Sequence, residues 1–270
     1  MVKNNRKVLI IGASGYLGSE VVNQTPDDFE LYLGYRSEPI KDIKYTQVKI
    51  DLLDNDSLQR GLEEISPDIV IHVARIGEFD KNPDRAKEVT TEIATLAKMK
   101  KARLIYMSSD AVFDGENGNY KESDKANPIT DYGKAKLAAE SVIKSELSKY
   151  VIVRAGYIYG KGKSGFDNRT KKLMDETGGG NTVKRFKDMY RTPIHVSKLA
   201  KSIWKLANSD FNGIIHIGEE KKSVFQFCQD LLIDSGLNPG LVVKDSLEKR
   251  DLNIAQDTSL DTELFRNVVI

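Results

Sequence analysis

A tyrosine and a lysine four positions apart have the types and spacing that point most directly to chemistry. Tyr132 and Lys136 lie in the segment Tyr-Gly-Lys-Ala-Lys, and on a helix two side chains at this spacing share one face. A free tyrosine has a pKa of about 10, too high for an effective proton donor near neutrality. A neighbouring ammonium stabilises the phenolate and lowers that pKa. The same ammonium can hold the ribose hydroxyls of a nucleotide cofactor, so the pair predicts a general-acid site that works beside a nucleotide.

Two serines upstream add to this site. Ser108 and Ser109 directly follow the apolar run 103–107, so their hydroxyls are expected at the carboxyl edge of a sheet, where ligands bind in doubly wound folds. A serine, a tyrosine and a lysine that converge beside a nicotinamide form a general-acid site for carbonyl reduction. We therefore expect Ser109, Tyr132 and Lys136 to be the catalytic residues. The tyrosine–lysine spacing alone occurs by chance in many helices, so this interpretation depends on a cofactor site elsewhere in the chain.

A glycine-rich segment near the start of the chain supplies that site. An apolar strand candidate runs into Gly-Ala-Ser-Gly-Tyr-Leu-Gly, and a helical pattern follows. Glycines let the backbone turn sharply and approach a pyrophosphate, and a helix N-terminus offers free N–H groups and partial positive charge to that anion. A plain structural turn is the alternative, but the strand–loop–helix context favours dinucleotide binding. The residues expected to contact the cofactor here are Gly12, Ser14, Gly15, Tyr16, Leu17 and Gly18.

Other candidate cofactor contacts lie at the ends of later strands. The second strand candidate ends without a carboxylate, and Arg36 follows it. An arginine can pair with a 2′-phosphate through charge-assisted hydrogen bonds, which favours NADPH over NADH. A solvated loop arginine is the alternative. Asp51, beside Leu52, is placed to accept from the adenine amino group or to cap the next helix, and Val73 and Ala74 at the end of the fourth strand complete the set.

The elements that must position these residues alternate between strands and helices. Such alternation predicts βαβ units, a parallel sheet and helices on both faces, that is, an α/β, doubly wound (Rossmann) fold. The strand candidates are Lys7–Ile11, Glu30–Gly34, Tyr45–Ile50, Ile69–Val73, Arg103–Met107 and Tyr150–Arg154. The helix candidates are Leu17–Asn23, Asp56–Ile65, Pro83–Lys100 and Tyr132–Lys149.

After Arg154 the alternation stops. Segment 160–181 is rich in glycine and lysine and is expected to be a loop or hairpin. A helix at 196–208, a strand at 213–217 and a helix at 224–235 follow. We expect a dinucleotide-binding domain over 1–160 and a small substrate-binding lobe over 161–270, with 193–217 returning to the main sheet.

Composition excludes several classes of function. The 270 residues carry 41 basic and 40 acidic side chains, a net charge of +1, so neither nucleic acid nor an anionic membrane is an expected partner. The single cysteine, Cys228, allows no internal disulfide and suits a reducing compartment. We expect the polar N-terminus to be neither a signal peptide nor a membrane span, and we expect a cytoplasmic protein. The three histidines lack metal-ligand spacing, so no metal is expected; His72 and His216 are interpreted as satisfied strand histidines.

Taken together, these motifs resemble the extended short-chain dehydrogenases/reductases, and within them the dTDP-4-dehydrorhamnose reductase group. The resemblance covers nearly the whole chain. Its most specific block is 108–115, SSDAVFDG, which is similar to that group's STDYVFDG. The further matching blocks are Pro128, Tyr132 through Glu140, Arg154 through Gly160, Thr192 through Ile194, and Asp257 through Ser259.

The resemblance implies that Ser109 orients the substrate carbonyl, Tyr132 donates the proton, and Lys136 tunes Tyr132 and binds ribose. It also implies an NADPH-dependent reductase of a nucleotide-linked 4-keto deoxysugar, as in dTDP-rhamnose biosynthesis. The sequence departs from the family pattern on the substrate side. Residues 72–77 replace the family's NAAAxT and bring in Arg75, Thr90 replaces the asparagine of a VN pair, and Ala111 replaces the tyrosine of STDYVFDG.

Two other functions fit the same fold. A nucleotide-sugar epimerase or dehydratase with bound NAD would use an acid beside the serine, and Asp110 stands there. A non-catalytic regulatory subunit would bind NADP for structure alone, which the altered 72–77 segment and Thr90 make plausible. An exposed helix pair on a sheet of this type often forms a two-fold interface, so a homodimer is one expected assembly.

Overall fold

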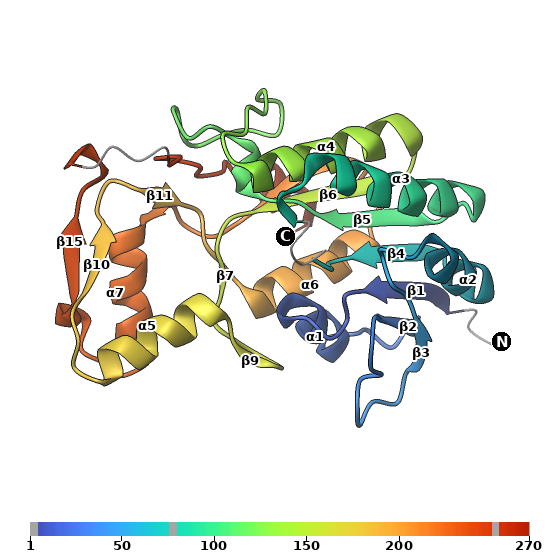
Figure 1. Cartoon of the computed structure of the whole chain (residues 1–270), viewed down its shortest axis with the longest axis horizontal. Coiled ribbons are helices and arrows are strands. Elements are labelled where there is room, and N and C mark those ends of the chain that lie inside the picture. Colours follow the sequence, from blue (N-terminus) through green and yellow to red (C-terminus); the bar gives the residue numbers. More distant parts are fainter. Residues whose placement is uncertain (1–4, 76–79, 250–253, 270) are drawn as a thin grey trace.

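A seven-stranded, fully parallel sheet forms the centre of the computed structural model, which describes residues 5–75, 80–249 and 254–269 (Figure 1). The strand order is β13-β6-β5-β4-β1-β2-β3, so the chain winds outward from β1 in one direction as far as β3 and then, from β4 onward, in the other. This is the doubly wound order, and the predicted fold class is confirmed. The strands are β1 (Arg6–Ile11), β2 (Phe29–Tyr35), β3 (Thr46–Lys49), β4 (Ile69–His72), β5 (Arg103–Met107), β6 (Tyr150–Ala155) and β13 (Gly213–Ile217).

Helices cover both faces of this sheet. On one face α1 (Tyr16–Asn23) and α6 (Val196–Ala207) pack together over an apolar core, and on the other face α2 (Asn55–Ile65), α3 (Pro83–Met99) and α4 (Asp131–Glu146) bury a second core (Figure 1). The periodic apolar positions of each helix make these contacts, as in α3, whose buried side chains include Val89, Ile93 and Ala97.

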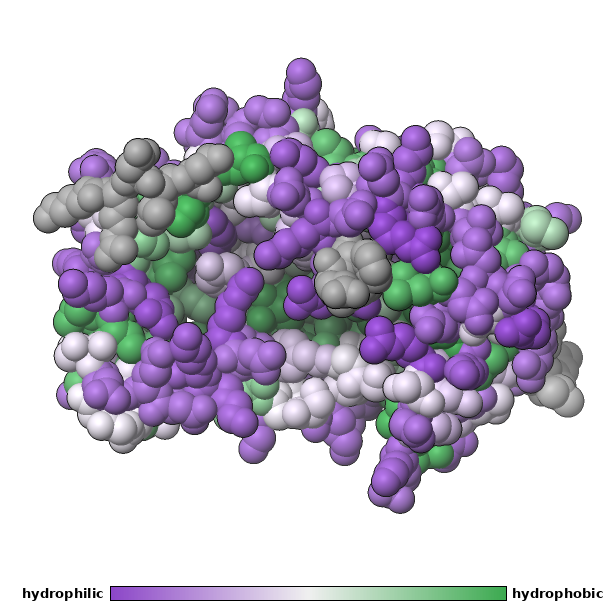
Figure 2. Space-filling model, in the orientation of Figure 1, coloured by the Kyte–Doolittle hydropathy of each residue, from purple (hydrophilic) through white to green (hydrophobic). Residues whose placement is uncertain are grey.

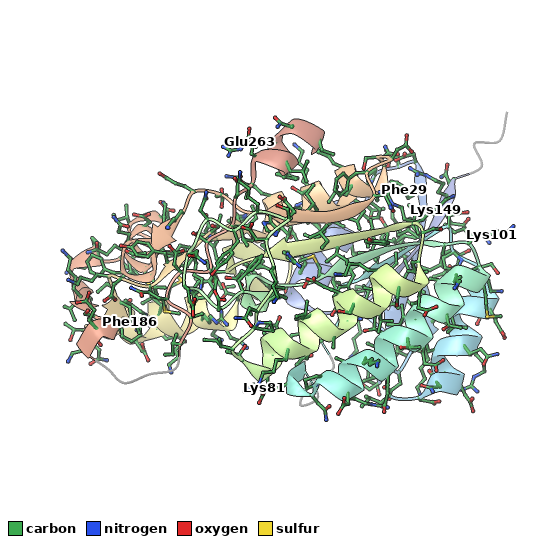
Figure 3. The ribbon with its side chains drawn as sticks, turned by 90° about the horizontal axis from the view of Figure 1, so that it is seen from above. Phe29, Lys81, Lys101, Lys149, Phe186 and Glu263 are labelled. Atoms are coloured by element: carbon green, nitrogen blue, oxygen red, sulfur yellow. The ribbon has the colours of Figure 1, made fainter. Side chains whose placement is uncertain are left out.

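A smaller group of elements lies beyond the carboxyl ends of the strands. The figure labels Lys101 and Lys149, which precede β5 and β6, at one end of the sheet, and Phe186 at the opposite end of the molecule (Figure 3). Parallel strands therefore run from the lysines toward the smaller group. Its elements are β10 (Val183–Phe186) paired with β15 (Val242–Asp245), α5 (Asn168–Gly178) and α7 (Val224–Asp234), around a separate apolar core.

Short elements connect the two groups and close the chain. They are η2 (Asp110–Val112), β7 (Ile158–Tyr159), β8 (Lys161–Gly162), β9 (Gly165–Phe166), β11 (Tyr190–Arg191), β12 (Ile194–His195), β14 (Lys222–Ser223), η3 (Pro239–Leu241), η4 (Leu247–Lys249) and α8 (Glu263–Val269).

The sequence prediction was wrong for part of segment 160–181. A hairpin of β8 and β9 does form there, but it is followed by helix α5, not by further loop. Asp167 caps that helix through hydrogen bonds from two backbone N–H groups, and the glycine run predicted as a turn lies at its C-terminal end. The helix buries only Thr170, Leu173 and Thr177, so its apolar stripe is too short to stand out in the sequence. Strand β13 pairs with β6 within 193–217, while the division into two domains remains a prediction.

Candidate functional site

The phosphate-loop candidate lies where β1 and β4 are neighbours and the strand order reverses. β1 ends at Ile11 and α1 begins at Tyr16. Gly12 has φ +94°, and a Cβ atom there would lie 2.6 Å from the Cα atom of Ala74, just past β4. A Cβ on Gly18 would lie 2.0 Å from the Gly12 carbonyl oxygen. The two glycines therefore let the loop turn tightly against β4 and the first turn of α1.

This loop fits a dinucleotide pyrophosphate. Ser14 and Gly15 are exposed, and Gly15 is the N-cap of α1 without a side-chain hydrogen bond to the first helical N–H groups. The first turn of α1 contains no acidic residue that would repel an anion. Since a helix N-terminus carries partial positive charge, these groups can bind phosphate oxygens.

Substitution of Gly12 by alanine tests this geometry. We expect Gly12→Ala to destabilise the fold by more than about 1 kcal/mol and to weaken NADPH binding, because alanine is strained at positive φ and its methyl would collide with the Ala74 backbone just past β4. Urea unfolding and fluorescence titration measure the two effects. The control is Gly178→Ala in α5, where a Cβ meets nothing within 4 Å and the φ is not positive. Equal stability and NADPH affinity in the two variants would contradict the assigned role of Gly12.

The three predicted catalytic residues are brought together at the carboxyl end of β5 and the start of α4. Ser109 follows β5, and Tyr132 lies in the first turn of α4, which Thr130 caps by accepting from the Gly133 N–H at 3.1 Å. A Cβ on Gly133 would lie 2.0 Å from the Ala111 carbonyl oxygen, so only glycine allows this close approach of α4 to η2. The contact brings the Tyr132 phenol close enough to Ser109 for the serine hydroxyl to affect the pKa of the phenol.

Lys136 lies one turn further along α4 with its ammonium toward β5. Its Nζ donates to the Met107 carbonyl oxygen at 2.9 Å and to the Tyr106 hydroxyl at 3.3 Å. The same atom lies 5.8 Å from the ring centroid of Tyr132. Burial lowers the pKa of Lys136 to about 8, although Asp80 acts in the opposite direction.

The sequence analysis predicted a lowered pKa for Tyr132, and for the protein without a bound ligand this prediction is wrong. Burial raises the pKa of Tyr132 above its ordinary value, and Asp80 adds to the increase, while Arg75 and the hydrogen bond with Ser109 oppose it. The phenol is therefore protonated at neutral pH. That state suits a proton donor to a carbonyl, and a phenolate base would be disfavoured.

A buried polar network holds α4 against the sheet behind these residues. Arg154 in β6 donates to both carboxylate oxygens of Glu140, at 2.9 and 2.6 Å, and Ser108 donates to the same carboxylate at 2.5 Å. Arg154 also lies 3.4 Å from Nε2 of His216 in β13. Ser108 is thus committed to this network, and Ser109 is the serine that faces Tyr132.

The remaining cofactor candidates lie around the carboxyl edge. Arg36 is exposed immediately after β2, and Leu52 is buried. Asp51 accepts from the Leu53 N–H at 3.0 Å, but the N-cap of α2 is Asp54, so the capping alternative for Asp51 is wrong. Val73 follows β4 and is partly buried, and Ala74 packs against Gly12 as described above.

Three residues near the site were given no role in the sequence interpretation, or a different one. Asp80 is buried and pairs with Arg75, Nε to Oδ2 at 2.6 Å, and the charges of this pair act on Tyr132 and Lys136. An acidic residue shortly after a strand end is the signal that could have found Asp80.

Asp110 is buried and accepts from Thr258 at 2.6 Å and from Ser109 at 3.0 Å. Tyr106, hidden within an apolar strand, gave no such signal.

His72 also differs from its interpretation as a satisfied strand histidine. Its Nδ1 atom is buried and has no hydrogen-bond partner among the described residues. His216, by contrast, has Nδ1 3.0 Å from the Tyr120 carbonyl oxygen. Within residues 5–75, 80–249 and 254–269, no three His, Cys, Asp or Glu side chains are grouped to hold a metal ion, and no helix there has the length and apolar character to cross a membrane.

A cavity of about 350 Å³ lies in the smaller group of elements, between α5, α7 and β10. Tyr157, Tyr159 and Phe227 supply aromatic walls, and Arg169, with its guanidinium carbon 4.6 Å from the Tyr157 ring centroid, supplies positive charge. Figure 2 shows apolar surface at the bottom of a hollow between the two groups of elements. Lys161, Lys163 and Phe166, which belong to the hairpin of β8 and β9, do not line this cavity.

Comparison with known proteins gives consistent results. The family model described as RmlD substrate binding domain matches residues 6–259. A structure described as a hypothetical dTDP-4-dehydrorhamnose reductase from Sulfolobus tokodaii is 30% identical, with TM-score 0.81, and covers 97% of this chain and 94% of that chain. A dTDP-4-dehydrorhamnose reductase from Bacillus anthracis in complex with NADP has TM-score 0.81 at 24% identity, over 97% and 92% of the two chains. Methionine adenosyltransferase 2 subunit beta of Bos taurus is 30% identical over 75% of this chain and 62% of its own length.

Proposed function

The chain belongs to the RmlD substrate binding domain family, and from this premise we propose that it is an NADPH-dependent reductase of a nucleotide-linked 4-keto deoxysugar. More broadly, it is an NAD(P)-dependent oxidoreductase of the sugar-nucleotide reductase type. The observation that carries the proposal is the convergence of Ser109, Tyr132 and Lys136 at the carboxyl end of β5 and the start of α4.

In this mechanism each side chain has one task. The reduced nicotinamide supplies hydride. Ser109, beside Tyr132, orients the substrate carbonyl, and Tyr132, protonated at neutral pH, gives its proton to the carbonyl oxygen. The Lys136 ammonium, 5.8 Å from the centroid of the Tyr132 ring, is close enough to stabilise the phenolate that remains. Its second task is to bind the ribose hydroxyls of the cofactor.

The cavity supports a nucleotide on the substrate. Aromatic side chains can stack on a base, and Arg169 and Arg185 can face a diphosphate. We place the substrate nucleotide there, in a lobe over 161–270 that joins a dinucleotide-binding domain over 1–160, with 193–217 returning to the sheet. We further propose that the protein acts in the cytoplasm, that it forms a homodimer, and that it takes part in dTDP-rhamnose synthesis.

Oxidation of NADPH with a panel of nucleotide-linked 4-keto sugars tests the function. We expect turnover with at least one member of the panel, measured as the loss of absorbance of the reduced nicotinamide. Absence of turnover with every member, together with tight NADPH binding, would refute the reductase.

The preference for NADPH is tested at Arg36. Its exposed guanidinium just after β2 is placed for a 2′-phosphate, and a hydrogen bond to a charged group is worth about 1.5–3 kcal/mol. Arg36→Ala should therefore weaken NADPH binding about tenfold or more and leave NADH binding unchanged. Arg60→Ala, which removes an exposed arginine from α2, is the control. A similar loss for both cofactors, or for neither, would contradict the assignment.

A non-catalytic, NADP-binding regulatory subunit is the second candidate. The likeness to methionine adenosyltransferase 2 subunit beta favours it. Stoichiometric co-purification of an enzyme partner, with NADPH bound and no turnover, would support this candidate. A nucleotide-sugar epimerase or dehydratase is less favoured, because Asp110, its expected acid, is already bound by Thr258 and Ser109 and lies 3.7 Å from the Nε atom of Arg191.

A further inference from the structure

The Lys136 ammonium is held from the side of the sheet by two oxygen atoms. An ammonium has three N–H donors. Two of them bond to the Met107 carbonyl oxygen, 2.9 Å away, and the Tyr106 hydroxyl, 3.3 Å away, and these are its only acceptors among the described residues. Lys136 also lies over the Tyr106 ring, with Nζ 4.9 Å from the ring centroid. One N–H is therefore left for the side of the site where Tyr132 lies.

Tyr106 itself is an unusual residue for its position. It lies in the middle of the sheet, in a strand that also contains Leu104 and Ile105, and it is 5% exposed. A hydroxyl in such a place costs free energy unless it is hydrogen-bonded. The Lys136 ammonium is the partner that the structure provides. A phenylalanine would satisfy the packing of this strand equally well, so packing does not explain the hydroxyl.

The neighbours of Tyr106 keep it in place without adding charge. In the β4–β5 register it pairs with His72, and the two ring centroids are 5.4 Å apart. Burial, together with the charge of Lys136, lowers the pKa of His72 to about 3, so the histidine is neutral and does not repel the ammonium. The ring of His72 thus packs beside that of Tyr106 on the same face of the sheet.

We propose that Tyr106 is a positioning residue, whose hydroxyl, together with the Met107 carbonyl, fixes the Lys136 ammonium so that its third N–H is directed to the ligand side. The identity of that ligand, the cofactor ribose, rests on the proposed function. The charged and titratable groups that act on Lys136 from its surroundings are Asp80, Arg75, Glu140, His72 and Tyr132.

The electrostatics explain why each acceptor matters. Burial favours the neutral amine and lowers the pKa of Lys136 to about 8, so at neutral pH the charged form has only a small margin. A hydrogen bond accepted from the ammonium favours the charged form. Removal of the Tyr106 hydroxyl should lower that pKa further and let the ammonium turn away from its present direction.

Competitive labelling of lysines with acetic anhydride across a pH series tests this directly. The full-length protein is labelled without added nucleotide, and modification at Lys136 is read by mass spectrometry. In the wild type we expect a midpoint at about 8. In Tyr106→Phe the midpoint should fall by about one pH unit, because the lost bond to a charged group is worth about that much. NADPH affinity, measured by fluorescence, should fall about tenfold.

The matched control is Tyr32→Phe, which removes the same atom from β2, separated from β5 by β4 and β1, where the hydroxyl bonds to Glu30. Its Lys136 midpoint and NADPH affinity should equal those of the wild type. Thermal unfolding of both variants identifies any general loss of structure. Neither readout requires turnover, so they report on Tyr106 even if no keto sugar is reduced. An unchanged midpoint and unchanged NADPH affinity in folded Tyr106→Phe would overturn the proposal.

Discussion

Replacement of Tyr132 by phenylalanine should lower kcat by about 10²–10⁴-fold, the usual contribution of a positioned general acid. The phenol is the protonated group beside Ser109, because burial raises its pKa above the ordinary value. The ring itself remains in Tyr132→Phe, so packing at the start of α4 is preserved. NADPH oxidation with the best substrate of the panel measures the loss, and fluorescence titration should show NADPH affinity close to that of the wild type.

The pH dependence of this reaction follows from the same pKa and from that of Lys136. A proton donor acts only below its pKa, and Lys136 must stay charged to act beside Tyr132. The rate of reduction should therefore be constant below about pH 8, fall as Lys136 loses its proton near that pH, and fall again as more alkaline pH deprotonates Tyr132. The pH–rate profile of the residual activity in Tyr132→Phe should lack the alkaline decrease that is caused by ionisation of the phenol. Tyr150→Phe, at the start of β6 and the opposite end of the sheet, is the control and should retain full activity. Wild-type turnover in Tyr132→Phe would remove the tyrosine from the mechanism.

The sequence was sufficient to predict those parts of the site that depend on local geometry. The four-residue spacing of Tyr132 and Lys136 places both on one face of any helix, and a serine directly after a buried strand must lie at the sheet edge. The strands at 103–107 and 213–217 begin and end where their apolar runs do. The roles of the individual site residues remain predictions until variants are measured.

What depends on tertiary contacts could not be predicted in the same way. The hydroxyl of Tyr106 meets Lys136 only because the end of β5 and the second turn of α4 are packed together, and no short-range pattern encodes that contact. The sign of the Tyr132 pKa shift was wrong for a related reason. The sequence suggested the neighbouring charge of Lys136, whereas burial, a property of the whole fold, has the larger effect.

The largest expected effect on stability concerns the ion pair behind the site. The side chains of Arg154 and Glu140 are 3% and 0% exposed, and their contact is bidentate. Arg154→Met would leave the Glu140 carboxylate buried, with Ser108 as its remaining hydrogen-bond donor among the described residues. Loss of one partner of a buried ion pair costs about 3–5 kcal/mol, because the other charge is left uncompensated. Urea unfolding at neutral pH should show a loss of this size.

Two further variants identify the cause. Lys98→Met breaks an exposed pair with Glu146, in which the side chains are 62% and 41% exposed, and should change stability by less than about 0.5 kcal/mol. The double variant Arg154→Met, Glu140→Leu removes both charges and should recover much of the loss, because no uncompensated carboxylate remains. A double variant no more stable than Arg154→Met alone would show that packing around Arg154, including its contact with the Phe113 ring, is the larger contribution.

The same ion pair should also affect the chemistry, since Glu140 follows Lys136 by one helical turn and the two share a face of α4. The carboxylate anchors this helix to β6, and Lys136 reaches β5 from the same helix. Arg154→Met, assayed well below its unfolding temperature, should therefore bind NADPH more weakly than Lys98→Met does. Equal affinity in the two variants would limit the Arg154–Glu140 pair to stabilising the fold, and the position of Lys136 would then depend on Tyr106 and the Met107 carbonyl alone.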